Sequence, residues 1–233
     1  MDDKTTSPST SRKDITRRIS QVVFSMLMTA VLLFVPAGTL KWPMAWAYLG
    51  ASILVMAINA FVLPKELIAE RGKKKENVEK WDQQLTRLLL IPWMGLYLVA
   101  GLDWRFGWTP HLLLWISLTG LAVFILGTFL VTWAMLSNHY FSTAVRIQYE
   151  RGHKVCDTGP YRYIRHPGYT GMMVYHLISP LIFSSWWAFI PAGLTAVLFI
   201  VRTILEDRTL REKLEGYAAY AEKVRWRLVP GAW

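Results

Sequence analysis

Residues 152–171 are the part of this 233-residue chain whose side chains are best suited to chemistry. The stretch holds two histidines, three tyrosines, four glycines and two prolines between long apolar segments. Its Gly-Pro and His-Pro-Gly sequences are turn signals and predict irregular backbone. Irregular backbone beside a membrane is tolerated where it packs in protein or lines a wet cavity. Such a loop is suited to a flat polar ligand, which backbone N–H groups and tyrosine rings would hold.

A solvated basic loop is an equally good interpretation of the same residues from composition alone. His166 precedes Pro167 and is also compatible with a residue that begins a helix. Tyr161 and Tyr163 are also compatible with anchors at the membrane surface.

Two further polar groups lie at the ends of apolar segments. Arg202 and Glu206 are four residues apart and would share one face of a helix, beside Asp207. Ionisable residues in this position are candidates for a functional site, although a simple ion pair explains them equally well. Residues 138–142, with Gln148 beyond them, are polar and would face the same pocket or merely end a helix.

The composition places the chain in a membrane. Hydrophobic residues make up 53% of it, and they come in long runs. A net charge of +10 would suggest nucleic acid for a soluble protein, but here it indicates cationic loops near anionic lipid headgroups, with no nucleic-acid partner. The single cysteine, Cys156, excludes an intrachain disulfide, and we find no cluster of metal-ligand residues.

Apolar runs long enough to cross a bilayer define the expected spans. Four are clear, a fifth is short and contains Pro180, and a sixth is again long enough. They cover residues 19–38, 44–63, 88–102, 112–136, 172–183 and 186–205. Ser184-Ser185 would join the last two as a helical hairpin whose first arm need not span fully.

Basic residues fix the expected orientation. They concentrate at the N-terminus, in residues 64–87 and 137–170, and after residue 202, whereas the intervening loops carry few. With six crossings, all these segments lie on one side, which the positive-inside rule makes the cytoplasm. Both termini and the candidate site are therefore expected there. Six tryptophans of the opposite loops would form an interfacial belt. They are Trp42, Trp46, Trp104, Trp108, Trp186 and Trp187.

The expected fold is an all-α bundle of five to six transmembrane helices. A disordered cytoplasmic N-terminus would cover residues 1–18, a four-span membrane region residues 19–136, and a functional core residues 137–233. That core would contain the cytoplasmic loop, the hairpin and an amphipathic C-terminal helix, because Leu210, Leu214, Tyr217, Ala221 and Val224 recur at spacings of three and four.

The combination of these motifs resembles the isoprenylcysteine carboxyl methyltransferase family, whose core pattern phospholipid N-methyltransferases share. Gly159-Pro160-Tyr161 is followed by Arg-His-Pro-x-Tyr-x-Gly over residues 165–171, and Glu206-Asp207 stands one apolar segment later. The resemblance covers roughly the last hundred residues. It departs at the tail, where Leu214-Glu215-Gly216-Tyr217 replaces the family's Phe-Gly-x-x-Tyr.

The resemblance implies methyl transfer from S-adenosylmethionine to a lipophilic acceptor that enters from the bilayer, with membrane lipids as neighbours. Arg202 and Glu206 would be catalytic, and Arg202 and Asn138 would bind the acceptor. The implied cofactor-binding residues are Gln148, His153, Lys154, Val155, Cys156, Tyr161, Arg165, His166, Pro167, Gly168, Tyr169, Gly171 and Glu206. Neither the acceptor nor the oligomeric state can be predicted from the sequence.

The chemistry leaves the acceptor open. A carboxylate is ionised at neutral pH and needs no base, and a guanidinium suits it by bidentate geometry. An amine would need a base, for which Glu206 or His166 would serve. A membrane sterol-type reductase with NADPH is an alternative, with Arg162 and Arg165 as a sparse phosphate site. A non-enzymatic membrane protein is disfavoured because the spans contain few polar residues.

Overall fold

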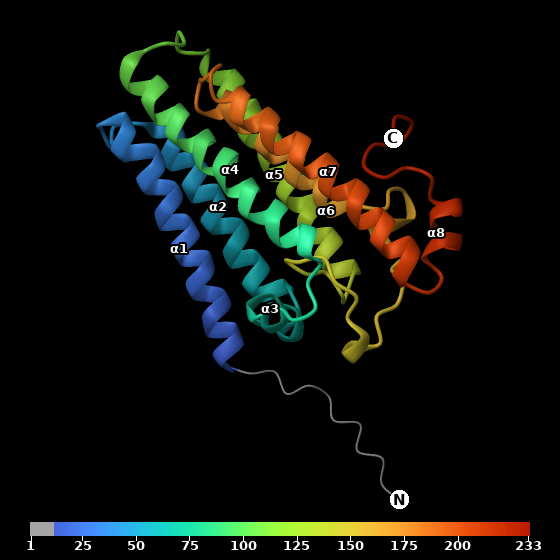
Figure 1. The fold of residues 1–233 in the computed structure, drawn as a ribbon. Coiled ribbons are helices and arrows are strands. Elements are labelled where there is room, and N and C mark those ends of the chain that lie inside the picture. The colour runs from blue at the N-terminus through green and yellow to red at the C-terminus, as the bar shows by residue number, and fades with distance from the viewer. Residues whose placement is uncertain (1–11) are drawn as a thin grey trace, which may run out of the picture.

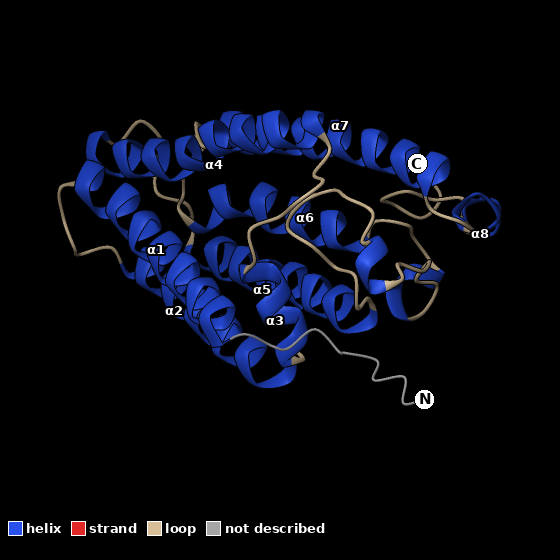
Figure 2. Ribbon diagram, turned by 60° about the horizontal axis from the view of Figure 1, so that its bottom comes forward, coloured by secondary structure: helices blue, strands red, loops and turns tan. Residues whose placement is uncertain are grey.

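The computed structural model describes residues 12–233, and these form a helical bundle without strands (Figures 1 and 2). The helices in chain order are α1 (Arg12–Ala37), α2 (Pro43–Val62), α3 (Lys65–Gly72), α4 (Lys80–Phe106), α5 (Leu114–Ser137), α6 (Pro167–Ile182), α7 (Phe189–Lys213) and α8 (Tyr217–Lys223). Short 3-10 helices occupy Tyr149–Arg151 and Gly159–Arg162 in the connection between α5 and α6.

Five of these helices, α1, α2, α4, α5 and α7, are long and apolar enough to cross a membrane. The expected all-α bundle of a multi-pass membrane protein is thereby confirmed. Helix α6, at 16 residues, is the short arm of the expected hairpin. It begins at Pro167, five residues before the predicted start, so Pro167, Gly168 and Tyr169 lie in a helix and not in irregular backbone. The alternative of His166 as a helix-start residue is correct, because His166 is the N-cap.

Helix α6 is short, but its last turn reaches the end of the bundle opposite the polar loops. It starts at the end that carries the polar loops, and its last turn accepts a hydrogen bond from Ser117 of α5 through the Leu181 carbonyl (3.0 Å). Ser185, just after it, donates to Asp103 at the end of α4 (2.5 Å). Ser184, with a positive φ of 54°, turns the chain back into α7. The hairpin therefore returns the chain to the end from which it started.

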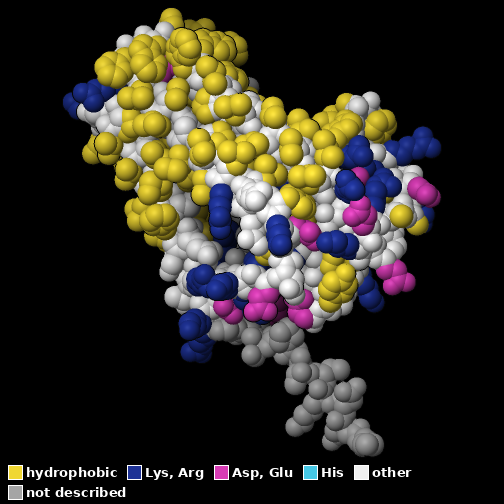
Figure 3. Space-filling model, viewed as in Figure 1, with side chains coloured by type: hydrophobic (Ala, Val, Ile, Leu, Met, Phe, Trp, Pro, Cys, Tyr) yellow, Lys and Arg dark blue, Asp and Glu magenta, His cyan; other side chains and the backbone are white. Residues whose placement is uncertain are grey.

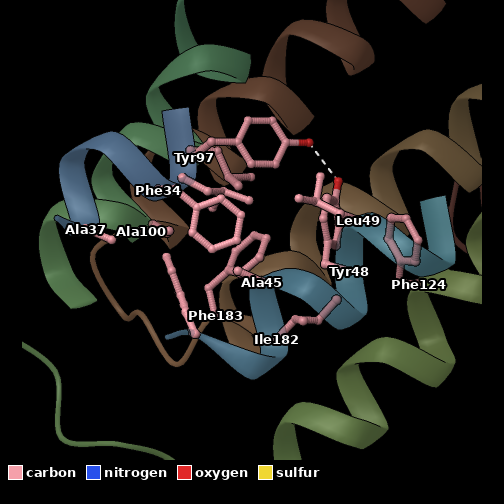
Figure 4. Packing of buried hydrophobic residues seen from close by; sticks show 14 of the residues in the cluster. Phe34, Ala37, Ala45, Tyr48, Leu49, Tyr97, Ala100, Phe124, Ile182 and Phe183 are labelled. Atoms are coloured by element: carbon pink, nitrogen blue, oxygen red, sulfur yellow. Dashed lines mark hydrogen bonds between the residues drawn. The ribbon is translucent and has the colours of Figure 1, made fainter. Parts of the chain in front are cut away.

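The core lies at the opposite end of the bundle from α8 and is aromatic. Tyr48 of α2 and Tyr97 of α4 share a hydrogen bond of 2.7 Å, and Phe183 packs against both rings (Figure 4). Trp42 also belongs to this core, because it is 1% exposed and stacks on Trp104. The expected interfacial belt is therefore wrong for Trp42, whose ring contacts protein, whereas Trp46, Trp108, Trp186 and Trp187 are exposed.

The surface divides into an apolar body and a charged end (Figure 3). Large apolar side chains on the outside of the long helices are exposed, as expected for residues that contact lipid. Examples are Phe61 (89% exposed) and Ile91 (68% exposed). The charged side chains gather where α3, the connection between α5 and α6, and α8 lie together (Figures 1 and 3).

Two expected boundaries differ from the structure. Helix α1 begins at Arg12, so residues 12–18, predicted to be disordered, are helical, while residues 1–11 lie outside the described part. The predicted amphipathic tail is two helices, because the chain breaks after Lys213 and Gly216 takes a left-handed conformation with φ of 80°. Leu214, Tyr217 and Tyr220 then pack on Ile147 of the connection between α5 and α6.

Candidate active site

A cavity opens at the charged end of the bundle, between the connection from α5 to α6, the start of α6 and the end of α7. Most of the sequence-predicted site residues line it. They are Asn138, Gln148, His153, Lys154, Val155, Cys156, Tyr161, Arg165, His166, Gly168, Tyr169, Arg202 and Glu206. Pro167 and Gly171 do not line it. The structure therefore brings together segments that are separated by up to 68 residues of chain.

The start of α6 explains the residue types of the motif. Pro167 is the first helical residue, where its missing N–H has no cost. Gly168 lies against Phe141, because a Cβ there would stand 2.7 Å from the Phe141 ring. Gly171 lets α6 approach α5, since its Cβ would stand 2.6 Å from the Gly127 carbonyl oxygen. Pro167 and Gly171 thus determine where α6 begins and how closely it packs on α5, and α6 in turn positions the residues that line the cavity.

Arg165 ties the motif to the C-terminal segment. Its Nε and Nη2 donate to the Asp207 carboxylate at 2.7 and 3.1 Å. Its Nη1 donates to the carbonyls of Val224 and Arg225 at 2.7 and 2.8 Å. Because every guanidinium nitrogen is engaged, Arg165 anchors the wall of the cavity, and its charge is matched by Asp207.

Glu206 stands on α7 at the cavity and accepts a hydrogen bond from the Tyr169 hydroxyl. Arg202, one turn earlier, does not bond to Glu206 but forms an ion pair with Asp82 of α4 at 2.8 Å. The Arg202 guanidinium also lies over the Tyr169 ring and donates to the Thr143 carbonyl. The simple i,i+4 ion pair considered from the sequence is therefore not formed.

The segment after His153 offers backbone groups to the cavity. Within residues 12–233, the N–H groups of residues 154–159 donate to no protein acceptor. Lys154, Val155 and Cys156 line the cavity. Lys154 is exposed and Val155 and Cys156 are half-buried, so their unpaired N–H groups are accessible to a ligand in the cavity.

Gln148 and His153 hold this segment in place. The Gln148 side chain is 1% exposed, donates to the Tyr140 carbonyl (2.6 Å) and accepts from Arg151 (2.6 Å). Its backbone N–H donates to Nδ1 of His153. Burial, followed by the charges of Arg151 and Arg146, lowers the pKa of His153 to about 4. His153 is therefore neutral at physiological pH and acts as an acceptor.

The charges of the cavity are largely paired internally. Arg146 pairs with Glu70 (2.9 Å), Arg165 with Asp207 and Arg202 with Asp82. Among residues 12–233, Arg71, Lys154 and Glu206 line the cavity without an ion-pair partner. Two free cations and one free carboxylate thus remain for ligands of opposite charge.

The residues that sequence reasoning missed come from α3 and from the first turn of α4. Arg71 of α3 lines the cavity, and Glu70 and Asp82 neutralise its arginines. Glu70 and Asp82 are 4% and 1% exposed. The sequence feature that could have identified Glu70 and Asp82 is that they are acidic residues in a strongly basic segment. Their partners on distant helices cannot be read from spacing.

A helical membrane protein with a polar cavity at one end of the bundle, lined by a motif loop and the last spanning helix, is the class that fold and site define. Comparison with known proteins narrows this class. Residues 119–212 match the model of the isoprenylcysteine carboxyl methyltransferase family. This region of the chain is similar to that family, which agrees with the resemblance of the motifs.

Curated relatives agree with the family. A rice (Oryza sativa subsp. indica) protein described as a probable protein-S-isoprenylcysteine O-methyltransferase is 28% identical over 112 residues. The match covers 47% of this chain and 59% of that protein. Protein-S-isoprenylcysteine O-methyltransferase B of Arabidopsis thaliana is 26% identical over 113 residues, covering 47% of this chain and 57% of the relative. The chain thus spans less than two thirds of the length of the curated relatives that it matches.

Proposed function

We propose that this protein transfers a methyl group from S-adenosylmethionine to a lipophilic acceptor, of the prenylcysteine carboxylate type or a similar amphiphile. The observation that carries the proposal is that Arg165, His166 and Tyr169 of the motif line one cavity together with Glu206, all inside the family-matched region. The names of the rice and Arabidopsis relatives favour an isoprenylcysteine acceptor. The acceptor enters from the bilayer, and the cavity faces the cytoplasm.

The chemistry of the cavity residues fits the cofactor. S-adenosylmethionine has an amino acid end, a ribose diol and a flat ring, and it supplies a methyl group on a positively charged sulfur that leaves as a neutral thioether. The N–H groups of residues 154–156 are free to donate to its oxygen atoms. The Glu206 carboxylate has no ion-pair partner among the described residues and suits either a hydroxyl pair or a cation.

The remaining residues position the reactants and exclude water. Tyr169 holds Glu206 by a hydrogen bond, and the Arg202 guanidinium packs over the Tyr169 ring. Burial raises the pKa of Tyr161, so this phenol stays neutral beside Asn138. An activated methyl group needs chiefly alignment with its acceptor and a dry site, which rigid side chains of this kind provide.

The arrangement favours a methyltransferase over an NADPH-dependent reductase. For a reductase, the sequence proposed Arg162 and Arg165 as the site of the cofactor phosphates. Arg165, one of the two candidates from the sequence, is neutralised by Asp207, and Arg162 is exposed and does not line the cavity.

The test is calorimetric titration of the detergent-purified full chain with S-adenosylmethionine and, separately, with NADPH. We expect S-adenosylmethionine alone to bind. Glu206→Ala should weaken its binding by roughly ten- to a hundredfold, the value of a charge-assisted hydrogen bond. Glu222→Ala, which removes an exposed carboxylate on α8, should have no effect. Normal binding by Glu206→Ala and by His166→Ala would overturn the site, and NADPH binding alone would overturn the function.

A further inference from the structure

Arg71 is the cationic side chain of the cavity that the proposed cofactor half leaves unexplained. It lies on α3, outside the family-matched region, and faces the cavity from the side opposite α8. Its Nη1 atom is buried and has no hydrogen-bond partner among the described residues. A buried guanidinium nitrogen without an acceptor costs free energy, so binding of an anion at this position would be favourable.

The surroundings of Arg71 do not supply that anion. Its guanidinium lies 5.3 Å from the centre of the Phe141 ring, which positions it but does not neutralise it. Glu70, its neighbour in sequence, is already paired with Lys75 and Arg146. Burial, with the charge of Arg18 as a second cause, lowers the pKa of Arg71 to about 9. Arg18 itself forms no ion pair with residues 12–233.

A second cavity lies within the bundle, with walls from α1, α2, α4, α5 and α6. Arg71 does not line it, but Arg18 and Tyr175, the two residues whose charges act on Arg71, do. Met172, one turn before Tyr175 on α6, lines the first cavity. Val22, Met26, Val55, Met56, Phe124 and Val131 give the second cavity apolar walls within the membrane region. An amphiphile with its charged group at Arg71 would therefore have room for a chain among the spans.

We infer that Arg71, supported by Arg18, binds the carboxylate of an anionic amphiphilic acceptor, whose chain lies in the second cavity. Arg202, expected from the family resemblance to hold this carboxylate, is already neutralised by Asp82 at 2.8 Å. Arg71 is free in the part of the chain that the structure describes, and a guanidinium is the group best shaped for a carboxylate. This inference rests on the proposed function for the identity of the acceptor and selects a carboxylic acid over an amine.

The test measures binding of N-acetyl-S-farnesylcysteine and of its methyl ester to the full chain in detergent. The two probes differ only in the charge that Arg71 would recognise. We expect wild-type protein to prefer the acid by roughly tenfold or more, as befits a charge-assisted hydrogen bond in a buried site. Arg71→Gln should bind both probes equally while S-adenosylmethionine affinity stays unchanged. Arg87→Gln, an exposed arginine on α4 outside both cavities, should behave as wild type.

Arg71→Met keeps the apolar stem that packs on Phe141, and Arg71→Lys keeps a charge without the planar fork. Arg71→Met should lose the preference for the acid, and it provides the test if Arg71→Gln does not fold. Arg71→Lys should retain part of the preference. An unchanged preference in folded Arg71→Met, or equal binding of both probes by wild type, would overturn the inference. Absence of S-adenosylmethionine binding by wild type would instead overturn the proposed function, and the acid preference would still decide the role of Arg71.

Discussion

Asp207 is the residue on which the geometry of the site most depends. Its carboxylate is 2% exposed and accepts from Arg165, from Tyr217 at 3.0 Å and from Arg227 at 3.1 Å. These partners belong to the motif, to α8 and to the segment after it. One side chain of α7 thus joins three segments around the cavity. The sequence placed Asp207 beside Glu206 but gave it no role.

Asp207→Asn should therefore destabilise the protein strongly. Breaking a buried pair leaves Arg165 charged and uncompensated, which costs about 3–5 kcal/mol. We expect a fall of that size in the free energy of unfolding, measured in detergent by denaturant titration. Glu212→Gln is the matched control, because its pair with Arg208 is exposed (55% for Glu212 and 77% for Arg208) and should contribute little to stability. Equal stability of the two variants would contradict the assigned role.

His153 predicts a pH dependence of stability. Its pKa in the folded protein, about 4, lies below the ordinary value of 6.5. As the pH falls below about 6.5, the unfolded chain binds a proton that the folded protein does not, so the fold loses stability down to about pH 4. Between about pH 7.5 and about pH 5, the thermal midpoint of wild type should fall more than that of His153→Asn, whose amide oxygen still accepts from Gln148. Parallel changes in the two proteins would refute this.

The motif residues could be assigned to one site from the sequence because they are close along the chain and distinctive in type. Their individual roles could not. Arg165 and Gln148 were expected to contact the cofactor, yet their side chains are engaged with protein groups. Which donor meets which acceptor depends on tertiary contacts that no local pattern encodes.

At the scale of elements, the close approach of α5 and α6 places the motif. Gly127 and Gly171 face each other, and a Cβ on either would meet the backbone oxygen of the other, at 3.0 and 2.6 Å. Small residues of this kind allow helices in membranes to pack closely. The motif lies in the first turns of α6, so the spacing of these helices sets the shape of the cavity.

Gly171→Ala should push α6 away from α5 and lower both stability and S-adenosylmethionine affinity. We expect a loss of about 1–3 kcal/mol, typical of overpacking, in thermal or denaturant unfolding. Gly193→Ala on α7 is the control, because nothing lies within 4 Å of the added methyl group and a helical glycine is replaced by a better helix former. A Gly171→Ala protein as stable as Gly193→Ala would contradict the close packing.

The existence of the long helices was predictable, because a long apolar run has few possible structures other than a spanning helix. The residues at which the helices begin and end were less predictable. Pro167 and Gly168 were interpreted as turn residues, but proline and glycine also suit the first turn of a helix, and α6 begins at Pro167. The periodic tail suggested one helix, but Gly216 allows the chain to turn sharply before α8. Trp42 was assigned to the interface because of its position, and only the packing of Trp104 and Phe183 shows that it is buried.

At the scale of the molecule, the charged end gathers α3, the connection between α5 and α6, and α8 around the cavity (Figures 1 and 3). The expected separation between an N-terminal membrane region and a C-terminal functional core is incomplete, because α3 and the start of α4 supply Arg71 and Asp82 to the site. Such a contribution depends on how the helices pack against one another. The hydropathy of the sequence indicates the length of each helix but not its neighbours.

The positive-inside rule predicts that the charged end is cytoplasmic. Single cysteines in a Cys156→Ser background test this with a membrane-impermeant maleimide on intact cells. Lys41→Cys, in the exposed turn between α1 and α2, should react from outside. Lys74→Cys, in the exposed turn after α3, should react only after the membrane is opened. The reverse pattern would overturn the proposed orientation.

The most direct test of the central claim is transfer of a radiolabelled methyl group from S-adenosylmethionine to N-acetyl-S-farnesylcysteine by the purified chain. We predict a lipophilic product whose label is released by base, as a methyl ester requires. Glu206→Ala should reduce the rate by roughly tenfold or more, while Glu222→Ala should leave it unchanged. A folded protein that binds S-adenosylmethionine but labels neither this acid nor a phospholipid amine would contradict the account.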